Sequence, residues 1–371
     1  MVPVRERIGT KPVNHRILML CVVMALAACG RSTPEQSRAL EYPATATVEH
    51  TDSYHGTEVV DPYRWLEDDV RESAAVAQWV DEQNELAFAY LKAIPERDII
   101  KERLTELWDH ERYGMPRKEA GRYYYSHNDG LQNQSVIYVQ QNLDADAELL
   151  IDPNTWSDDG TVALAAYYPG PTGKHIAYLV QDGGSDWRKA RVMEVDTRKV
   201  LDDELSWLKF TSLSWAHDGS GFYYSRYPAT SEDRKFQSLN LNQAVYFHRL
   251  GTPQTEDTLV YQSAENPEWG YSATVTDDGA HLVITTWKGT DNRYQLVHQD
   301  LTDPGASAEL LIEGFDYDYS LVGSIGRKLY FRTDNGAPRN RLIAIDVDDP
   351  DPESWEEIIA EAEDVLGGVN L

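Results

Sequence analysis

The chain has 371 residues, of which 41% are hydrophobic and 11% aromatic. This is enough apolar surface for a sizeable core, so the composition excludes an intrinsically disordered polymer. The formal net charge is −28, from 34 basic and 62 acidic residues, and the lack of a basic footprint argues against a nucleic-acid partner.

The N-terminus has the features of an export signal. Basic residues at positions 5, 7, 11 and 16 precede an apolar run at 17–28. The run is too short to span a bilayer, which takes about 20 residues, but it fits a signal-peptide core. It ends in Leu-Ala-Ala-Cys29, which resembles the lipobox of bacterial lipoproteins. We expect a signal peptide at 1–28, a lipid on Cys29, a tether at 29–41 and a periplasmic, membrane-anchored protein; a plain secretory signal is the alternative.

Two helices are predicted before residue 110. Apolar residues in 71–93 recur with helical spacing, as at Val76, Val80 and Leu91. Pro95 interrupts this pattern and can begin a second helix, because proline is tolerated in the first helical turn. The apolar residues of that second helix would be Ile99, Ile100, Leu104, Leu107 and Trp108.

Beyond Gly114 the pattern changes to short β-rich runs separated by turns. A corner of glycine followed by aromatic and β-branched residues recurs around Gly121, Gly173, Gly219, Gly279 and Gly326. Glycine suits such a corner because it accepts a positive φ without steric cost. A second strand is expected in each unit, at 136–143, 190–197, 244–250, 294–301 and 341–348.

A repeat of roughly fifty residues with about four short strands is typical of a β-propeller blade. We therefore expect a mainly β chain with about five blades, in which aromatic residues pack one blade on the next; an irregular β-sandwich is the alternative. The residues after 348 are expected to begin a further connection. An open ring exposes strand edges, so the pattern indicates either a five-bladed ring or part of a larger propeller.

Five longer stretches resemble the prolyl oligopeptidase family in order and spacing. They are VVDPYRWLED at 59–68, WVDEQN at 79–84, NDGLQNQSVIYVQ at 128–140, the stretch at 184–228 that begins GSDWRKARVMEVD, and NQAVYFHRLGTPQTEDTLVYQ at 242–262. The resemblance implies a seven-bladed propeller that caps an α/β-hydrolase domain. It also implies that 42–110 is a helical segment packed on that domain and that 111–371 holds five blades and part of a sixth, with most of the hydrolase domain absent.

No catalytic residue is assigned in this chain. A serine hydrolase of this kind needs a Gly-x-Ser-x-Gly turn between a strand and a helix, with His and Asp partners. The Gly-x-Ser sequences are Gly30-Arg31-Ser32, Gly183-Gly184-Ser185, Gly270-Tyr271-Ser272 and Gly305-Ala306-Ser307, and none has a glycine two residues after the serine. The chain also lacks the His-Glu-x-x-His and phosphate-loop motifs. No cofactor or metal is therefore expected.

Several single residues have both a functional and a structural interpretation. Asp186, Asp218 and Asp277 could be the carboxylates of a glycosidase funnel, but each lies beside a predicted turn, and turn formation is the preferred interpretation.

Five more side chains have both a functional and a structural interpretation. Trp65 and Trp79 could line a substrate path, although packing against a partner domain is preferred. Asn133 and Gln134 could bind peptide, but pairing with turn backbone is the simpler interpretation. Arg188 could attract a substrate carboxylate, and a surface ion pair is the alternative.

The resemblance favours the N-terminal and propeller part of an exported serine peptidase that cleaves short proline-containing peptides. On this hypothesis the propeller restricts access to the catalytic domain, and the chain alone is inactive. Two alternatives are a stand-alone periplasmic propeller that binds a partner without catalysis and a glycosidase-like propeller. Proline selectivity is not readable in these residues.

Overall fold

The computed structural model describes residues 40–230 and 238–371. The predicted signal peptide, Cys29 and most of the tether lie outside these residues. The chain divides into two compact units, one ending at Ala93 and the other covering Ile94–Leu371. Among the described helices, none is both long enough and apolar enough to cross a bilayer.

The first unit is a short hairpin followed by a helix. Strands β1 (Thr51–Tyr54) and β2 (Thr57–Val60) pair antiparallel, and both residues of the turn, His55 and Gly56, have positive φ. A 3-10 turn, η1 (Arg64–Glu67), leads to α2 (Ala74–Lys92). The hydroxyl of Ser73 accepts a hydrogen bond from the Val76 amide and caps this helix. The helix predicted within 71–93 is confirmed.

The second unit begins with α3 (Arg97–Trp108), which starts two residues after Pro95 as the sequence predicts. Every residue of α3 remains outside the buried core. The apolar side chains of α3 therefore do not pack into a hydrophobic core within the described residues.

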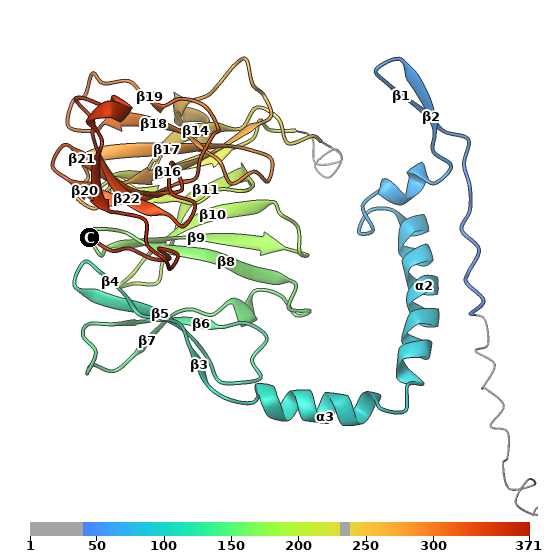
Figure 1. Cartoon of the computed structure of the whole chain (residues 1–371). Helices are drawn as coiled ribbons and strands as arrows, with labels where there is room; N and C mark the ends of the chain where they lie inside the picture. Colours follow the sequence, from blue (N-terminus) through green and yellow to red (C-terminus); the bar gives the residue numbers. More distant parts are fainter. Residues whose placement is uncertain (1–39, 231–237) are drawn as a thin grey trace, which may run out of the picture. The chain divides into compact units, whose positions relative to one another are not determined.

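Five antiparallel sheets follow α3 in the described residues, and each is a blade (Figure 1). In the last four blades the strands pair in chain order. Blade 1 contains β3 (Arg112–Tyr113), β4 (Arg117–Glu119), β5 (Arg122–Asn128), β6 (Val136–Gln140) and β7 (Glu148–Ile151). Blade 2 contains β8 (Val162–Pro169), β9 (His175–Asp182), β10 (Arg188–Glu194) and β11 (Val200–Leu208). Blade 3 contains β12 (Ser214–Trp215), β13 (Gly221–Arg226), β14 (Ala244–Arg249) and β15 (Thr258–Tyr261). Blade 4 contains β16 (Trp269–Val275), β17 (His281–Lys288), β18 (Gln295–Asp300) and β19 (Glu309–Ile312), and blade 5 contains β20 (Tyr319–Ile325), β21 (Lys328–Thr333), β22 (Arg341–Asp346) and β23 (Glu356–Ile359).

The glycine corners lie where the sequence places them. Gly121 lies between β4 and β5 of blade 1, and in each other blade the glycine lies between the first and second strands. Gly121, Gly173, Gly219, Gly279 and Gly326 all have φ between 60° and 79°. A side chain at such a φ is strained, which is why glycine recurs there. The five predicted second strands are also strands: β6 in blade 1, and the third strand of each other blade.

The expectation for the residues after 348 is wrong in one respect. Residues Glu356–Ile359 do not begin a connection; they form β23, which pairs with β22 and completes blade 5. All four residues of β23 are exposed. An exposed edge strand needs no alternation of apolar and polar residues. In the sequence, the acidic residues of β23 therefore resemble a connecting segment.

The hydrophobic core lies between the blades. Four buried clusters join blades 1 and 2, 2 and 3, 3 and 4, and 4 and 5. Aromatic side chains are central to these clusters: Tyr124, Phe222, Tyr224, Tyr271 and Phe331 are almost fully buried. The expected propeller with five blades and aromatic packing between them is confirmed. Each described sheet is antiparallel, so the described residues contain no α/β-hydrolase core.

Candidate functional site

The inner strands of blades 1 to 4 surround a hollow of about 600 Å³. Its wall is formed by β4, the end of β8, β12 and the end of β16, together with the turns that follow them. Several blades therefore contribute to one concave surface, which is where propellers and barrels commonly bind ligands.

The charged side chains around the hollow carry both signs. Arg117 and Glu119 on β4 form an ion pair at 3.1 Å, with Lys118 between them in sequence. His217 and Asp277 belong to the turns after β12 and β16. Such a mixed lining suits a polar, zwitterionic ligand such as a peptide better than a polyanion.

The hydroxyl and indole groups in the wall make hydrogen bonds that connect neighbouring blades. Ser212 and Ser272 lie 3.1 Å apart, oxygen to oxygen, and the Ser214 hydroxyl accepts from the Val275 amide at 2.8 Å. The indole of Trp215 donates to the Tyr168 carbonyl at 2.9 Å. The hydrogen bonds of these serines in the described residues go to another serine and to backbone, and none goes to a histidine that would activate a nucleophile.

The described Gly-x-Ser sequences lie in strands and turns. Ser272 lies inside β16, and Ser185 accepts from the Trp187 amide in the turn before β10. Ser307 lies between β18 and β19. The remaining candidate, at 30–32, is outside the described residues. None of the described three lies between a strand and a helix, so none is a nucleophile elbow.

The three candidate aspartates also have local roles. Asp218 accepts from the Ser220 amide and closes its turn, and the hydrogen bonds from Ser220 lower the pKa of Asp218. Asp186 lies 4.0 Å from the ammonium group of Lys209. Asp277 belongs to the turn after β16 and lines the hollow. A turn or surface role is thus sufficient for the first two, and Asp277 alone of the three lines the hollow.

The two candidate tryptophans hold the first unit together. The indole of Trp65 donates to the Ala46 carbonyl at 2.9 Å, and that of Trp79 donates to the Thr45 hydroxyl at 3.0 Å. Both therefore bind the extended segment that precedes β1. Packing against a partner domain stays a prediction.

Gln134 joins two blades rather than binding backbone within its own turn. Its amide nitrogen donates to the Val162 carbonyl at 2.8 Å, and its oxygen accepts from the Leu164 amide at 3.1 Å. The side chain thus pairs with the inner strand of blade 2 as another strand would. Asn133 similarly donates to the Gly160 carbonyl at 3.2 Å. The structural interpretation of this pair is confirmed, although the partner is the next blade.

A second glutamine repeats this arrangement. Gln243, just before β14, donates to the Lys209 carbonyl at 2.9 Å and accepts from the Tyr271 amide of blade 4 at 2.7 Å. We call Gln134 and Gln243 the glutamine clamps. By contrast, the Nε of Arg188 is buried without a hydrogen-bond partner among the described residues, and the structure shows no ion pair for this arginine there.

A buried charged cluster lies between blades 2 and 3, and no pattern in the sequence predicts it. His248 on β14 contacts Asp257 through Nδ1 at 2.7 Å and Asp203 on β11 through Nε2 at 3.1 Å, and the three side chains are 1%, 0% and 3% exposed. The hydroxyl of Tyr224 donates to Asp257 at 2.5 Å. Asp203 also accepts from the Gly251 amide at 2.6 Å.

The protonation of this cluster follows from its geometry. Both ring nitrogens of His248 face carboxylates, so both donate when the ring is charged. Burial lowers the pKa of His248, but the hydrogen bonds and charges of Asp257 and Asp203 outweigh it and hold the pKa above its usual value. Burial, and then Asp257, raise the pKa of Tyr224. The cluster is a buried staple between blades, closed to solvent, and has no access for a substrate.

The described residues contain no group of three or more His, Cys, Asp or Glu side chains arranged to bind a metal ion.

The comparison with protein families identifies the architecture. Residues 43–370 match the model of the prolyl oligopeptidase N-terminal β-propeller domain. The chain belongs to the prolyl oligopeptidase family. It is 37% identical over 347 residues to a prolyl endopeptidase from Elizabethkingia meningoseptica, covering 94% of this chain and 48% of that protein. It is 30% identical to prolyl oligopeptidase A from Amanita bisporigera, covering 84% of this chain and 45% of that protein.

Solved structures of this family have the same fold. A structure from an analysis of two prolyl endopeptidases matches with a TM-score of 0.64 and 37% identity, over 89% of this chain and 47% of the other. Prolyl oligopeptidase B from Galerina marginata, bound to a 25-residue macrocyclization substrate, matches with a TM-score of 0.74 and 28% identity, over 89% of this chain and 49% of the other. The chain spans about half the length of the curated relatives it matches.

Proposed function

We propose that this chain is the N-terminal segment and propeller of an exported prolyl oligopeptidase-type serine peptidase that cleaves short peptides after proline. In this proposal the propeller controls which peptides reach a catalytic domain, and the chain itself supplies no nucleophile. The observation that carries the proposal is the match to the family's propeller over residues 43–370, in a chain that covers about half of its relatives.

The hollow supports a role in controlling access. It is concave, about 600 Å³ in volume, and lined by both cationic and anionic side chains. A short peptide carries both charges and fits such a space, whereas a folded protein does not. The rigid wall, in which Trp215 and Ser214 hold neighbouring blades together, supports exclusion by size.

Exposed apolar side chains support the presence of a catalytic domain that binds the helices. On α3, Ile99, Leu104 and Trp108 are 69%, 50% and 57% exposed. On α2, Phe88 and Tyr90 are similarly exposed. Burying an apolar side chain of this size stabilises by about 1.5–3 kcal/mol, so such faces indicate a docking surface.

The test is a peptidase assay on the purified full chain with a proline-linked chromogenic peptide. We expect no turnover, because the described serines lack an activating histidine. Turnover that a serine-directed inhibitor blocks would show that the chain has a nucleophile and would contradict the proposal.

A second measurement tests whether a catalytic domain is encoded downstream of this chain. Sequencing the DNA downstream of codon 371 should reveal a Gly-x-Ser-x-Gly turn, in the same frame or a shifted one, within a few hundred codons. If no such sequence follows, the chain functions without a catalytic domain, and a binding role in the periplasm replaces the peptidase proposal.

A further inference from the structure

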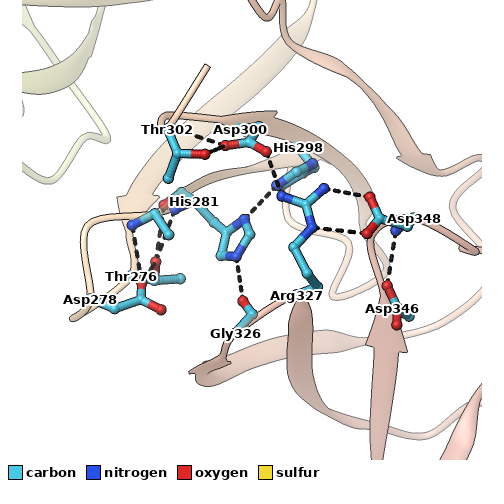
Figure 2. A network of polar contacts seen from close by, with 11 residues as sticks. Thr276, Asp278, His281, His298, Asp300, Thr302, Gly326, Arg327, Asp346 and Asp348 are labelled. Atoms are coloured by element: carbon cyan, nitrogen blue, oxygen red, sulfur yellow. Dashed lines mark hydrogen bonds and ion pairs between the residues drawn. The ribbon is translucent and has the colours of Figure 1, made fainter. Parts of the chain in front are cut away.

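Two histidines meet at the seam between blades 4 and 5 (Figure 2). His281, at the start of β17, is 1% exposed. Its Nδ1 lies 2.9 Å from Nε2 of His298 on β18, and its own Nε2 lies 2.8 Å from the carbonyl oxygen of Gly326. Gly326 belongs to the corner of blade 5, so this chain of contacts joins the two blades.

The partners determine where the protons lie. A carbonyl oxygen only accepts, so Nε2 of His281 donates to Gly326, and when the ring is neutral its Nδ1 carries the lone pair. Nε2 of His298 then donates to that lone pair. With both rings neutral, one proton lies in each contact, and both ring nitrogens of His281 are used.

Charged groups surround the pair on all the elements packed against it. Arg327, beside Gly326, binds Asp300 on β18 and Asp348 after β22. Asp278, in the turn before β17, accepts from the Ser324 hydroxyl of blade 5 at 3.0 Å. The remaining titratable neighbours are Glu309, opposite His298 on β19, and Asp346, whose carboxylate accepts from the Asp348 amide.

The neighbouring carboxylates that contact the seam stay charged in mild acid. Hydrogen bonds from Thr302 and Arg327 lower the pKa of Asp300, and Arg327 lowers that of Asp348. Burial raises the pKa of Asp278, but hydrogen bonds from Thr276 and its neighbours outweigh it, and the pKa lies below its usual value. Among the seam groups with a shifted pKa, His298 is therefore the one whose charge changes between neutral pH and about pH 4.

Acid weakens the seam in two steps. A first proton leaves the contact between the rings in place, because the charged ring donates to the lone pair of the neutral one, but it puts a cation beside Arg327. A second proton removes that lone pair, so that two N–H groups oppose each other between two charged rings. Both steps disfavour the closed seam.

We propose that the His281–His298 pair is an acid-sensitive latch that joins blades 4 and 5 when neutral and releases them when protonated. Desolvation, followed by the charge of His281, lowers the pKa of His298 to about 4 in the folded protein. A group with a lowered pKa contributes its full stability above its ordinary pKa of about 6.5 and loses it as the pH falls through the folded value. The seam should therefore open progressively between about pH 6.5 and pH 4.

The staple between blades 2 and 3 has the opposite dependence. The pKa of His248 is raised, so its contribution is complete below about pH 6.5 and lost only as the pH rises through the raised value. Acid should thus open the seam of blades 4 and 5 while the seam of blades 2 and 3 stays closed, which gives the test an internal reference.

The test is amide hydrogen exchange of the full chain from pH 7 to pH 4.5, corrected for the pH dependence of exchange chemistry. We expect the protection of backbone amides in the β20–β21 corner to fall as the pH is lowered. One titrating group allows at most about a tenfold fall per pH unit. The fall should be smaller than this because His298 is partly open to solvent. Protection of β14 should stay constant. Equal loss of protection in all blades would overturn the latch.

Two variants and one direct measurement complete the experiment. His298→Gln keeps a donor near Nε2 but cannot titrate, so the acid-dependent loss at the corner should disappear; His175→Gln, outside both histidine clusters, should behave as the parent chain does. Persistence of the loss in His298→Gln would overturn the proposal. If that variant does not fold, titration of 13C-labelled histidines in the parent chain decides: His298 must titrate well below 6.5, and titration near 6.5 would exclude the latch.

Discussion

At the scale of single residues, buried histidines determine how stability varies with pH. His248 has carboxylates on both ring nitrogens and is closed to solvent. His281 has a carbonyl oxygen on one side and the ring of His298 on the other. The pKa of His248 is raised and that of His298 is lowered, because the groups around the two rings differ.

Replacing His248 tests the charged staple. His248→Gln removes the cation and leaves Asp203 and Asp257 buried without a counter-charge. Breaking a buried pair in this way costs about 3 to 5 kcal/mol, and we expect that loss in urea unfolding at pH 6. Between pH 6 and pH 9 the parent chain should lose stability as the raised pKa of His248 is passed, and the variant should not. A variant that matches the parent in both respects would contradict a charged staple.

At the scale of elements, side chains complete the hydrogen bonding that strands leave open between blades. Adjacent blades are separate sheets, so the edges of their inner strands have free backbone groups. The glutamine clamps bind two such edges, at β8 and β16. An amide is suited to this because it donates and accepts at once, as a peptide group does.

Removing a clamp should destabilise the propeller. Gln134→Ala leaves the Val162 carbonyl and the Leu164 amide without their partner, and an unsatisfied buried group costs about 1 to 3 kcal/mol. Thermal unfolding should show a clearly lowered midpoint. Gln78→Ala is the matched control, because the side chain of Gln78 is exposed and its hydrogen bond goes to Glu82 on the same helix, α2. Similar midpoints for both variants would exclude a clamping role.

At the scale of the whole molecule, the blades form a series in which each contacts the next. The four core clusters join consecutive blades, and none of them includes residues of both blade 1 and blade 5. The other face of blade 1 carries a stack of Tyr113, His127, Tyr125 and Tyr138, of which Tyr113 is 62% exposed.

The N-terminal prediction also belongs to this scale. If Cys29 carries a lipid, the protein should fractionate with membranes and incorporate labelled fatty acid when expressed with its own leader. Cys29→Ser should move it to the soluble periplasmic fraction, because a stable anchor requires the acyl chains. Serine is isosteric, so the variant also controls for folding; equal membrane association of both forms would contradict lipidation.

The sequence alone determined the blade repeat, its glycine corners, both helices and the family. These features depend on local chemistry. A turn with a positive φ favours glycine, and the spacing of apolar residues along a short stretch of sequence indicates a helix or a strand. Only the tertiary structure decided that β23 belongs to blade 5, that Gln134 clamps the next blade, and that His248 meets Asp203 across 45 positions. Such contacts depend on how one blade is placed against another, and that placement leaves no periodic pattern in the chain.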